Sequence, residues 1–346
     1  LALDAQTTAS YNTGIGHATL STNTASYNTA VGRAALNANT TGESGVAVGL
    51  NALSSSTTGN NNTAVGRNSL VNNTTAANNV AVGAYALDAN TTGAQNTAVG
   101  QNAMGATTTS HDNCAFGHSA MGSATNTGSG RNNAFGYEAL QDITSGTQNN
   151  AIGFQAGANL TTGSYNQIMG SESMENSTTA NNCVALGHDT LRQNNANNNI
   201  AVGYQALTAN TTGYSNVAVG NYTLDANTTA IYCTGVGYAA LSANTTGNNN
   251  TGFGYYSLVA NTTGVNNVAV GVEALKTNTT GNSNTALGNY ALGLNETATN
   301  NTAAGYGSLY ANTASNNTGF GYFTLYSNTT GGANVAVGSY ALDANT

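Results

Sequence analysis

The side chains with the greatest capacity for metal chemistry gather in one short segment, His111-Asp112-Asn113-Cys114. Imidazole, carboxylate and thiolate are the usual ligands of zinc, so the run is a candidate metal site. Neighbouring residues of an extended segment point to opposite faces, however, and would converge poorly on one ion. We therefore expect neither a metal site nor a cofactor.

Patterns of catalytic residues give no support for an enzyme. The sequence contains no G-x-S-x-G, no H-E-x-x-H, no phosphate-binding loop and no carboxylates paired at a fixed spacing. Its three cysteines have no C-x-x-C spacing, which indicates neither a zinc site nor a disulfide framework. The sequence predicts a protein that is not an enzyme.

Tyrosines recur at two adjacent positions of a repeated unit, mostly in the C-terminal half. Rows of aromatic rings bind sugars or pack against another chain. Packing is the favoured interpretation here, and a sugar-binding surface is the alternative. This surface or interchain strip consists of Tyr204, Tyr238, Tyr255, Tyr306 and Tyr322.

Threonine pairs such as Thr40-Thr41, Thr91-Thr92 and Thr211-Thr212 recur at a constant spacing and would form rows. Such rows suggest ice binding. These threonines belong to turns, and the rows are broken in the middle of the chain. Ice binding is therefore the weakest of the functions that we consider.

All of these residues are positioned by a repeat of 17 residues. Its consensus is Asn-Thr-Ala-Val-Gly-x-x-Ala-Leu-x-Ala-Asn-Thr-Thr-Gly-x-x, whose positions we number as places one to seventeen. A short fixed period, with 5% charged residues and no Pro, is typical of a solenoid and not of globular domains. We expect one continuous array over residues 1–346 without separate domains, regular over 1–104 and 198–346 and less regular over 105–197.

Each unit predicts one coil of an all-β fold. Asn-Thr-Ala-Val is a short strand whose side chains at places two and four share one face, and we expect the Val at place four to line the interior with the Leu at place nine. Ala-Leu would be a second extended piece, and Asn-Thr-Thr-Gly a turn with left-handed Asn and Gly. A helix is disfavoured, because the stretch between Gly and this turn is too short. The predicted fold is a β-solenoid of about twenty coils, with these structural repeat residues: Gly32, Gly49, Gly66, Gly83, Gly100, Val31, Val48, Val65, Leu36, Leu53, Leu70, Asn28, Asn62 and Asn96.

The glycine at place five recurs in every coil, which predicts a positive φ or the close passage of another chain. Places three and eight also carry small residues, so a surface along the array must be closely approached. Because each coil buries few large apolar side chains, we expect asparagine ladders and oligomerisation to supplement the core. The alternative is a monomer whose alanines face a narrow interior.

The charge balance limits the partners. The net charge of −8 arises from 13 acids and 5 bases, which disfavours nucleic acid. No apolar run is long enough to cross a membrane. Residues Leu1 to Thr8 do not form a signal peptide, and the array starts and stops within a repeat. We expect either a piece of a longer protein or subunits that cap one another in a filament.

The less regular middle carries an insertion around Gly128 to Arg131 together with several acids and histidines. It is either a binding patch, a bend or a set of relaxed repeats on a solvated face. Cys183 and Cys233 occupy the same place three coils apart, roughly 14 Å at the usual strand spacing, which is too far for a disulfide. We expect free thiols, with cross-links between chains as the alternative.

The segments Asn28-Thr29-Ala30-Val31-Gly32, Asn96 to Gly100 and Asn216 to Gly220 resemble the Asn-Ser-Val-Ala-Ile-Gly-like motif of YadA-type heads in trimeric autotransporter adhesins. The longer unit is similar to repeats of phage tail-fibre and large bacterial surface proteins. The resemblance covers the whole chain, although the adhesin coil is about three residues shorter and no anchor or coiled-coil stalk is evident here. It implies a left-handed β-roll wound as an intimately packed homotrimer, located outside the cell on a cell or virion surface.

Three functions follow as expectations. The first is a structural extracellular fibre shaft of adhesin or tail-fibre type, which mediates attachment to a host or surface through a glycan or another cell-surface receptor. The second is the subunit of a self-polymerising extracellular filament. The third is an ice-binding solenoid.

Overall fold

The computed structural model describes residues 3, 9–125 and 129–345. Within these residues the chain is an all-β parallel solenoid without a helix, which confirms the predicted fold class at this level. The chain divides into two compact units, Leu1–Ala180 and Asn181–Thr346, each of which we describe by itself. The insertion predicted around Gly128 to Arg131 lies partly outside the described residues.

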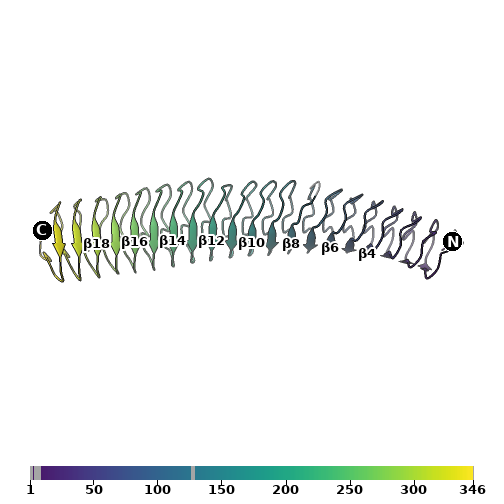
Figure 1. The fold of residues 1–346 in the computed structure, drawn as a ribbon, viewed down its shortest axis with the longest axis horizontal. Helices are drawn as coiled ribbons and strands as arrows, with labels where there is room; N and C mark the ends of the chain where they lie inside the picture. The colour runs from purple at the N-terminus through teal and green to yellow at the C-terminus, as the bar shows by residue number, and fades with distance from the viewer. Residues whose placement is uncertain (1–2, 4–8, 126–128, 346) are drawn as a thin grey trace. The chain divides into compact units, whose positions relative to one another are not determined.

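The first unit stacks ten three-residue strands, one from each coil, in parallel and in chain order. Successive strands pair place against place, so that Thr29, Ala30 and Val31 lie beside Val46, Ala47 and Val48 (Figure 1). The strands are β1 (Thr13–Ile15), β2 (Thr29–Val31), β3 (Val46–Val48), β4 (Thr63–Val65), β5 (Val80–Val82), β6 (Thr97–Val99), β7 (Cys114–Phe116), β8 (Asn133–Phe135), β9 (Asn150–Ile152) and β10 (Gln167–Met169).

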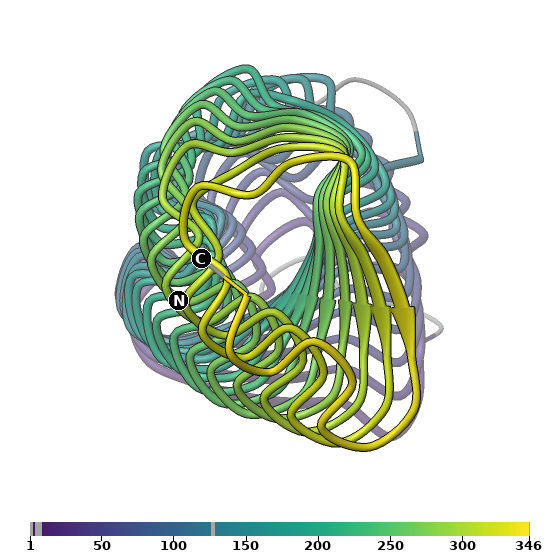
Figure 2. The ribbon, with the colours of Figure 1, turned by 90° about the vertical axis from the view of Figure 1, so that its left-hand side faces the viewer.

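The second unit repeats this arrangement. Its strands form one face of the stacked coils, drawn green to yellow in Figure 2, and turns form the rest of each coil. The strands are β11 (Val184–Leu186), β12 (Ile200–Val202), β13 (Val217–Val219), β14 (Thr234–Val236), β15 (Thr251–Phe253), β16 (Val268–Val270), β17 (Thr285–Leu287), β18 (Thr302–Ala304), β19 (Thr318–Phe320) and β20 (Val335–Val337).

The side of the strand that faces the interior differs from the prediction. Ala30 and Ala47, at place three, are 0% exposed, whereas Val48, at place four, is 36% exposed and Val31 and Val65 are half-buried. The expectation that valine lines the interior is wrong. The interior is already filled by the leucines at place nine and the asparagines at places one and twelve, which leaves room for a methyl group alone. The predicted leucines Leu36, Leu53 and Leu70 are buried in this core.

One pair of exceptions to the repeat confirms this packing. Gly157 stands where other coils have leucine or methionine at place nine, and Ile168 stands where they have alanine or glycine at place three. The Ile168 Cδ1 atom lies only 2.9 Å from where a Cβ of Gly157 would be. The larger residue in one coil therefore fills the volume that the smaller residue leaves in the neighbouring coil, as a close-packed interior requires.

Buried asparagines form the predicted ladders along one corner of the coils. The Oδ1 atom of Asn79, at place one, accepts the backbone N–H of Asn96 at 2.9 Å, and the Nδ2 atom of Asn96 donates to the Ser110 carbonyl at 2.7 Å. At place twelve, Asn39 donates both to the Gly42 carbonyl at 2.8 Å and to Asn23 Oδ1 at 2.6 Å. We call the asparagines at places one and twelve, with the place-fifteen carbonyl, the asparagine corner. It satisfies polar groups that burial would otherwise leave unpaired.

The backbone at place five explains its invariant glycine. These glycines have φ between +126° and +144°, as the sequence predicted. A Cβ on Gly32 would lie 2.5 Å from the carbonyl oxygen of Gly49 in the next coil. No side chain fits this combination of backbone angle and close approach.

The turns differ from the prediction in two respects. The left-handed residues are at places seven, nine and seventeen, for example Ala34, Leu36 and Ser44, and do not include Asn39 or Gly42. Leu36, in the predicted second extended piece, has φ +48° and belongs to a turn. The sequence-based prediction explained the Asn at place twelve by a left-handed backbone. In the structure this Asn instead makes the hydrogen bonds of the ladder.

Candidate binding surfaces

The largest candidate surface is the outer strand face, which we define as the side chains at places two and four of the strands. In the first unit its exposed members include Val48, Phe116, Phe135, Ile152 and Met169, and in the second Val219, Phe253, Val270, Leu287 and Phe320. Phe116 and Phe135 stack with ring centroids 5.1 Å apart. Place four is apolar in every strand and is exposed or half-buried, and such an apolar row along a surface is typical of an interaction surface.

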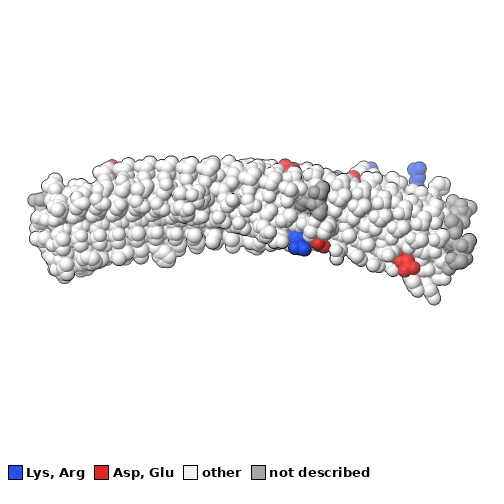
Figure 3. Space-filling view, turned by 45° about the horizontal axis from the view of Figure 1, so that its top comes forward, with Lys and Arg blue, Asp and Glu red and all other residues white. Residues whose placement is uncertain are grey.

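Charge is nearly absent from this face. Thr, Val, Ile, Cys, Asn and Gln occupy place two, and no Asp, Glu, Lys or Arg occurs at place two or four of β1–β20. On the face shown in Figure 3, the few charged side chains are scattered and form no continuous patch. Contact with this surface would therefore desolvate few charges.

The five predicted tyrosines of the aromatic strip all lie at place six in the second unit and are exposed. Tyr204 and Tyr238 each make an edge-on contact with Tyr222, and Tyr238 stacks on Tyr255 at 5.7 Å. Tyr306 stacks on Tyr322 at 5.7 Å. Between these groups, Val272 and Asn289 occupy place six, so the strip consists of two clusters.

The second cluster contains a pocket that sequence reasoning missed. A cavity of about 200 Å³ is lined by Tyr290, Tyr306, Gly307, Tyr310, Phe323 and Tyr326. We call the rings of this cluster, at places six, seven and ten between Tyr290 and Tyr340, the aromatic turn. The sequence feature that could have predicted this pocket is a change at place ten, where Lys276 and Gly293 are followed by Tyr310 and Tyr326 in successive coils.

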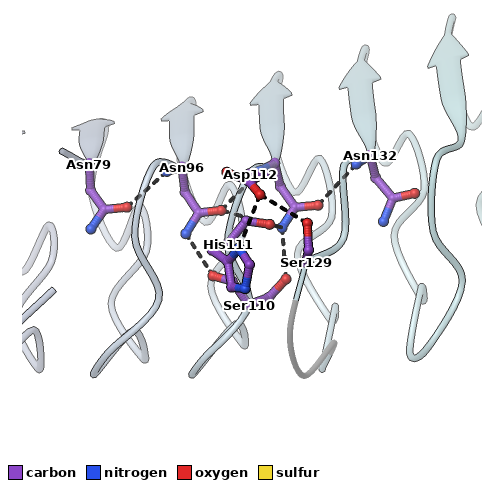
Figure 4. A network of polar contacts seen from close by, with 8 residues as sticks. Asn79, Asn96, Ser110, His111, Asp112, Ser129 and Asn132 are labelled. Carbon is purple, nitrogen blue, oxygen red and sulfur yellow. Dashed lines mark hydrogen bonds and ion pairs between the residues drawn. The ribbon is translucent and has the colours of Figure 1, made fainter. Parts of the chain in front are cut away.

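The His111 segment forms a polar network instead of a cluster of ligands around one centre (Figure 4). The Nδ1 atom of His111 lies 3.0 Å from Asp112 Oδ2, which also accepts the Ser129 hydroxyl at 2.9 Å. The Ser129 hydrogen bond, followed by that of His111, lowers the pKa of Asp112. Asn113 is committed to the asparagine corner, because its Oδ1 accepts the Asn132 N–H at 3.1 Å.

The three cysteines, all among the described residues, form no disulfide with one another. Cys114 lies on β7, whereas Cys183 and Cys233 are buried at place one. The Cys233 thiol donates to the Gly247 carbonyl at 3.2 Å, as the asparagine at this place does in other coils. Burial raises the pKa of Cys233 to about 11, so its thiol remains a protonated donor at neutral pH.

The paired threonines have different environments. At place thirteen the hydroxyls of Thr40, Thr91 and Thr211 donate to the place-thirteen carbonyl of the next coil at 3.0–3.1 Å. At place fourteen, Thr41, Thr92 and Thr212 are exposed. The threonines at place thirteen therefore stabilise the stacking of coils. Only the threonines at place fourteen form an exposed row, which is one residue wide.

Comparison with models of protein families found no match to this chain, and comparison with curated proteins found none either. Among the described residues, the structure contains no helix with the length and apolar character needed to cross a bilayer.

Proposed function

We propose that this chain is the shaft of an extracellular fibre of adhesin or tail-fibre type, in which three copies associate along their outer strand faces. The observation that carries the proposal is that this face has no charged residue and carries an apolar residue at place four of every strand of each unit. The threefold state, the left-handed winding and the location on a cell or virion surface rest on the resemblance to trimeric adhesins. The role is structural and non-enzymatic.

The occupant that best fits the outer strand face is another copy of the chain. Ten coils at a strand spacing of roughly 4.8 Å give each unit a face about 43 Å long. A second copy presents apolar side chains with the same spacing, so the two rows can interdigitate over their whole length. Burial of apolar surface contributes about 25 cal/mol per Å², so small gains per coil accumulate along the face.

The test is the mass in solution, measured by light scattering or analytical ultracentrifugation. We expect three times the 34.5 kDa mass of the chain. In a variant that carries Val219→Lys, Phe253→Lys and Val270→Lys, three charges on the outer strand face should dissociate the assembly. The matched control places lysine at the exposed place-fourteen residues Thr229, Thr246 and Thr263, and should remain assembled.

Two results would contradict the proposal. One is a wild-type protein that remains monomeric at all concentrations. The other is equal dissociation by the two lysine variants, which would show that charge at any place is disruptive. A mass that keeps growing with concentration would favour the self-polymerising filament.

Ice binding is a second candidate, supported by the exposed threonines at place fourteen. In the second unit, this row includes Thr212, Thr229, Thr246, Thr263 and Thr280 in consecutive coils. Regularly spaced hydroxyl and methyl groups are what an ice lattice would contact. Measurement of thermal hysteresis tests it, and Thr246→Lys should abolish any activity by interrupting the row.

A further inference from the structure

We propose that the pocket of the aromatic turn is a binding site for one neutral pyranose ring. The proposal goes beyond the fibre function and does not depend on it, because the pocket lies at places six, seven and ten and not on the outer strand face. It rests on how the pocket is built, on its size, and on the chemistry of its lining.

One wall of the pocket is positioned by the absence of a side chain from a row of rings. Place seven carries Tyr290, then Gly307, then Phe323 in three successive coils. Gly307 has φ +60°, and a Cβ on it would lie 2.5 Å from the Phe323 ring. Other coils place asparagine at the same backbone angle, for example Asn51 and Asn68 at φ +56°. Glycine at 307 is therefore not needed for the backbone angle, and its effect is to let the Phe323 ring, one wall of the pocket, lie against the backbone.

The walls are held in place by contacts among the rings themselves. Tyr310 and Tyr326 stack with centroids 5.2 Å apart and an interplanar angle of 8°. Phe323 contacts Tyr326 edge-on at 4.7 Å and Tyr306 at 5.4 Å. Gly293 allows the Tyr310 ring to lie against the backbone, since a Cβ there would be 2.7 Å from this ring. The pocket is thus formed before any ligand arrives, which lowers the entropic cost of binding.

The chemistry of the lining suits a sugar. The face of an aromatic ring is electron-rich and attracts the slightly positive C–H bonds on one side of a pyranose. Within the described residues, the hydroxyls of Tyr290, Tyr306, Tyr310 and Tyr326 have no hydrogen-bond partner in the chain. They can therefore bond the sugar hydroxyls, and so combine an apolar surface with polar groups at its rim.

Size and charge narrow the ligand class. A cavity of about 200 Å³ is smaller than the roughly 300–1,000 Å³ typical of pockets for drug-sized ligands, and suits a single ring. All six lining residues are uncharged. The cation Lys276, at place ten, is paired with Glu273 at 2.8 Å. A neutral hexose or N-acetylhexosamine is favoured over an acidic sugar.

Saturation-transfer NMR with the intact chain tests this assignment. The probes are the methyl pyranosides of glucose, galactose, mannose and N-acetylglucosamine at about 20 mM, above the millimolar dissociation constants expected for such small ligands. We expect transfer from the aromatic protons to at least one of these sugars. Absence of transfer to all four overturns the proposal.

Variants locate the site. Gly307→Asn displaces the Phe323 ring from the pocket wall while keeping a backbone angle that asparagine adopts at this place in other coils, and Tyr326→Ala removes a second wall. Each should weaken binding by about tenfold or more. The matched control is Tyr238→Ala, which removes a tyrosine at place six of the other cluster and should leave binding unchanged. Binding that survives Gly307→Asn, or that is lost equally in Tyr238→Ala, overturns the assignment. A circular dichroism spectrum of each variant verifies that it is folded.

Discussion

The asparagine corner and the aromatic turn are two regions of the same solenoid that differ in burial. The side chains of the first are buried and hydrogen-bonded, and the rings of the second are exposed or half-buried. At the asparagine corner, Asn250 donates to the Gly264 carbonyl at 2.6 Å and accepts the Asn267 N–H at 2.9 Å, so its polar atoms serve the fold. At the aromatic turn, the rings of Tyr306 and Tyr322 stack on each other and remain exposed. The comparison teaches that asparagines at one part of the coil hold successive coils together, whereas the rings at another part remain exposed to solvent. Substitutions should therefore cost stability at the corner and change surface properties at the turn.

The largest effect is expected at the place-five glycines. Gly49→Ala would place a Cβ 2.5 Å from the Gly66 carbonyl oxygen at φ +140°, and should destabilise the fold by about 4 kcal/mol in urea unfolding. Gly338→Ala is the control, because φ is +126° there but the nearest atom would be 3.8 Å away. Equal losses in the two variants would show that backbone strain, and not contact between coils, requires glycine.

The next largest effect should come from the asparagine corner. Asn250→Ala leaves the Asn267 N–H buried without a partner and removes one of the two side-chain donors to the Gly264 carbonyl, the other being Asn261, which should cost about 3 kcal/mol. Chemical unfolding monitored by circular dichroism measures the loss. Asn249→Ala, on an exposed neighbour, should cost less than about 1 kcal/mol. A tolerated Asn250→Ala would mean that the ladders do not stabilise the coils.

A smaller, pH-dependent effect is expected where cysteine replaces asparagine at this corner. Burial raises the pKa of Cys233 to about 11, above its value in the unfolded chain. The stability from the protonated thiol is therefore complete below the unfolded pKa, near 9, and falls by about 2 kcal/mol as the pH rises to 11. Because tyrosines also titrate in this range, the measurement is the difference in urea stability between the wild type and Cys233→Asn. A difference that does not change between pH 8 and pH 11 would contradict burial of this thiol.

The smallest effect belongs to the aromatic turn and its neighbouring cluster. Tyr238→Ala removes an exposed ring that stacks on Tyr255 at 5.7 Å, and should cost less than about 1 kcal/mol. Thermal unfolding measures it. A loss of stability as large as that of Asn250→Ala would show that the exposed rings stabilise the fold as much as the asparagine corner does, which contradicts the comparison.

The sequence was sufficient to predict the coil, its length and its glycine, because these depend on a period that recurs along the whole chain. The prediction of which strand side chains face the interior was wrong. A three-residue strand has two side chains on one face and one on the other, and the general preference for buried valine favoured the wrong face. The paired exceptions Gly157 and Ile168 carried the missing information, since only an inward place three lets isoleucine replace the volume of a missing leucine.

The candidate sites were less predictable, because they depend on departures from the repeat. The strip of tyrosines at place six was visible in the sequence, and the structure divides it into two clusters. The pocket needed knowledge that places seven and ten of successive coils lie side by side, which follows from left-handed backbone at places seven and nine. Sequence reasoning had assigned an extended piece to this segment, so Tyr310 and Tyr326 were not connected with Gly307.

The measurement that tests the central claim most directly compares enlargement of neighbouring strand residues. Ala269, at place three, is fully buried, whereas Val270, at place four, is 39% exposed. We expect Ala269→Leu to overpack the interior and lower stability by about 2 kcal/mol or more. Val270→Leu should change it by less than about 0.5 kcal/mol, since Leu287 occupies the same place in the next coil. The reverse order, with Ala269→Leu tolerated and Val270→Leu destabilising, would contradict the inward alanine and the outer strand face together.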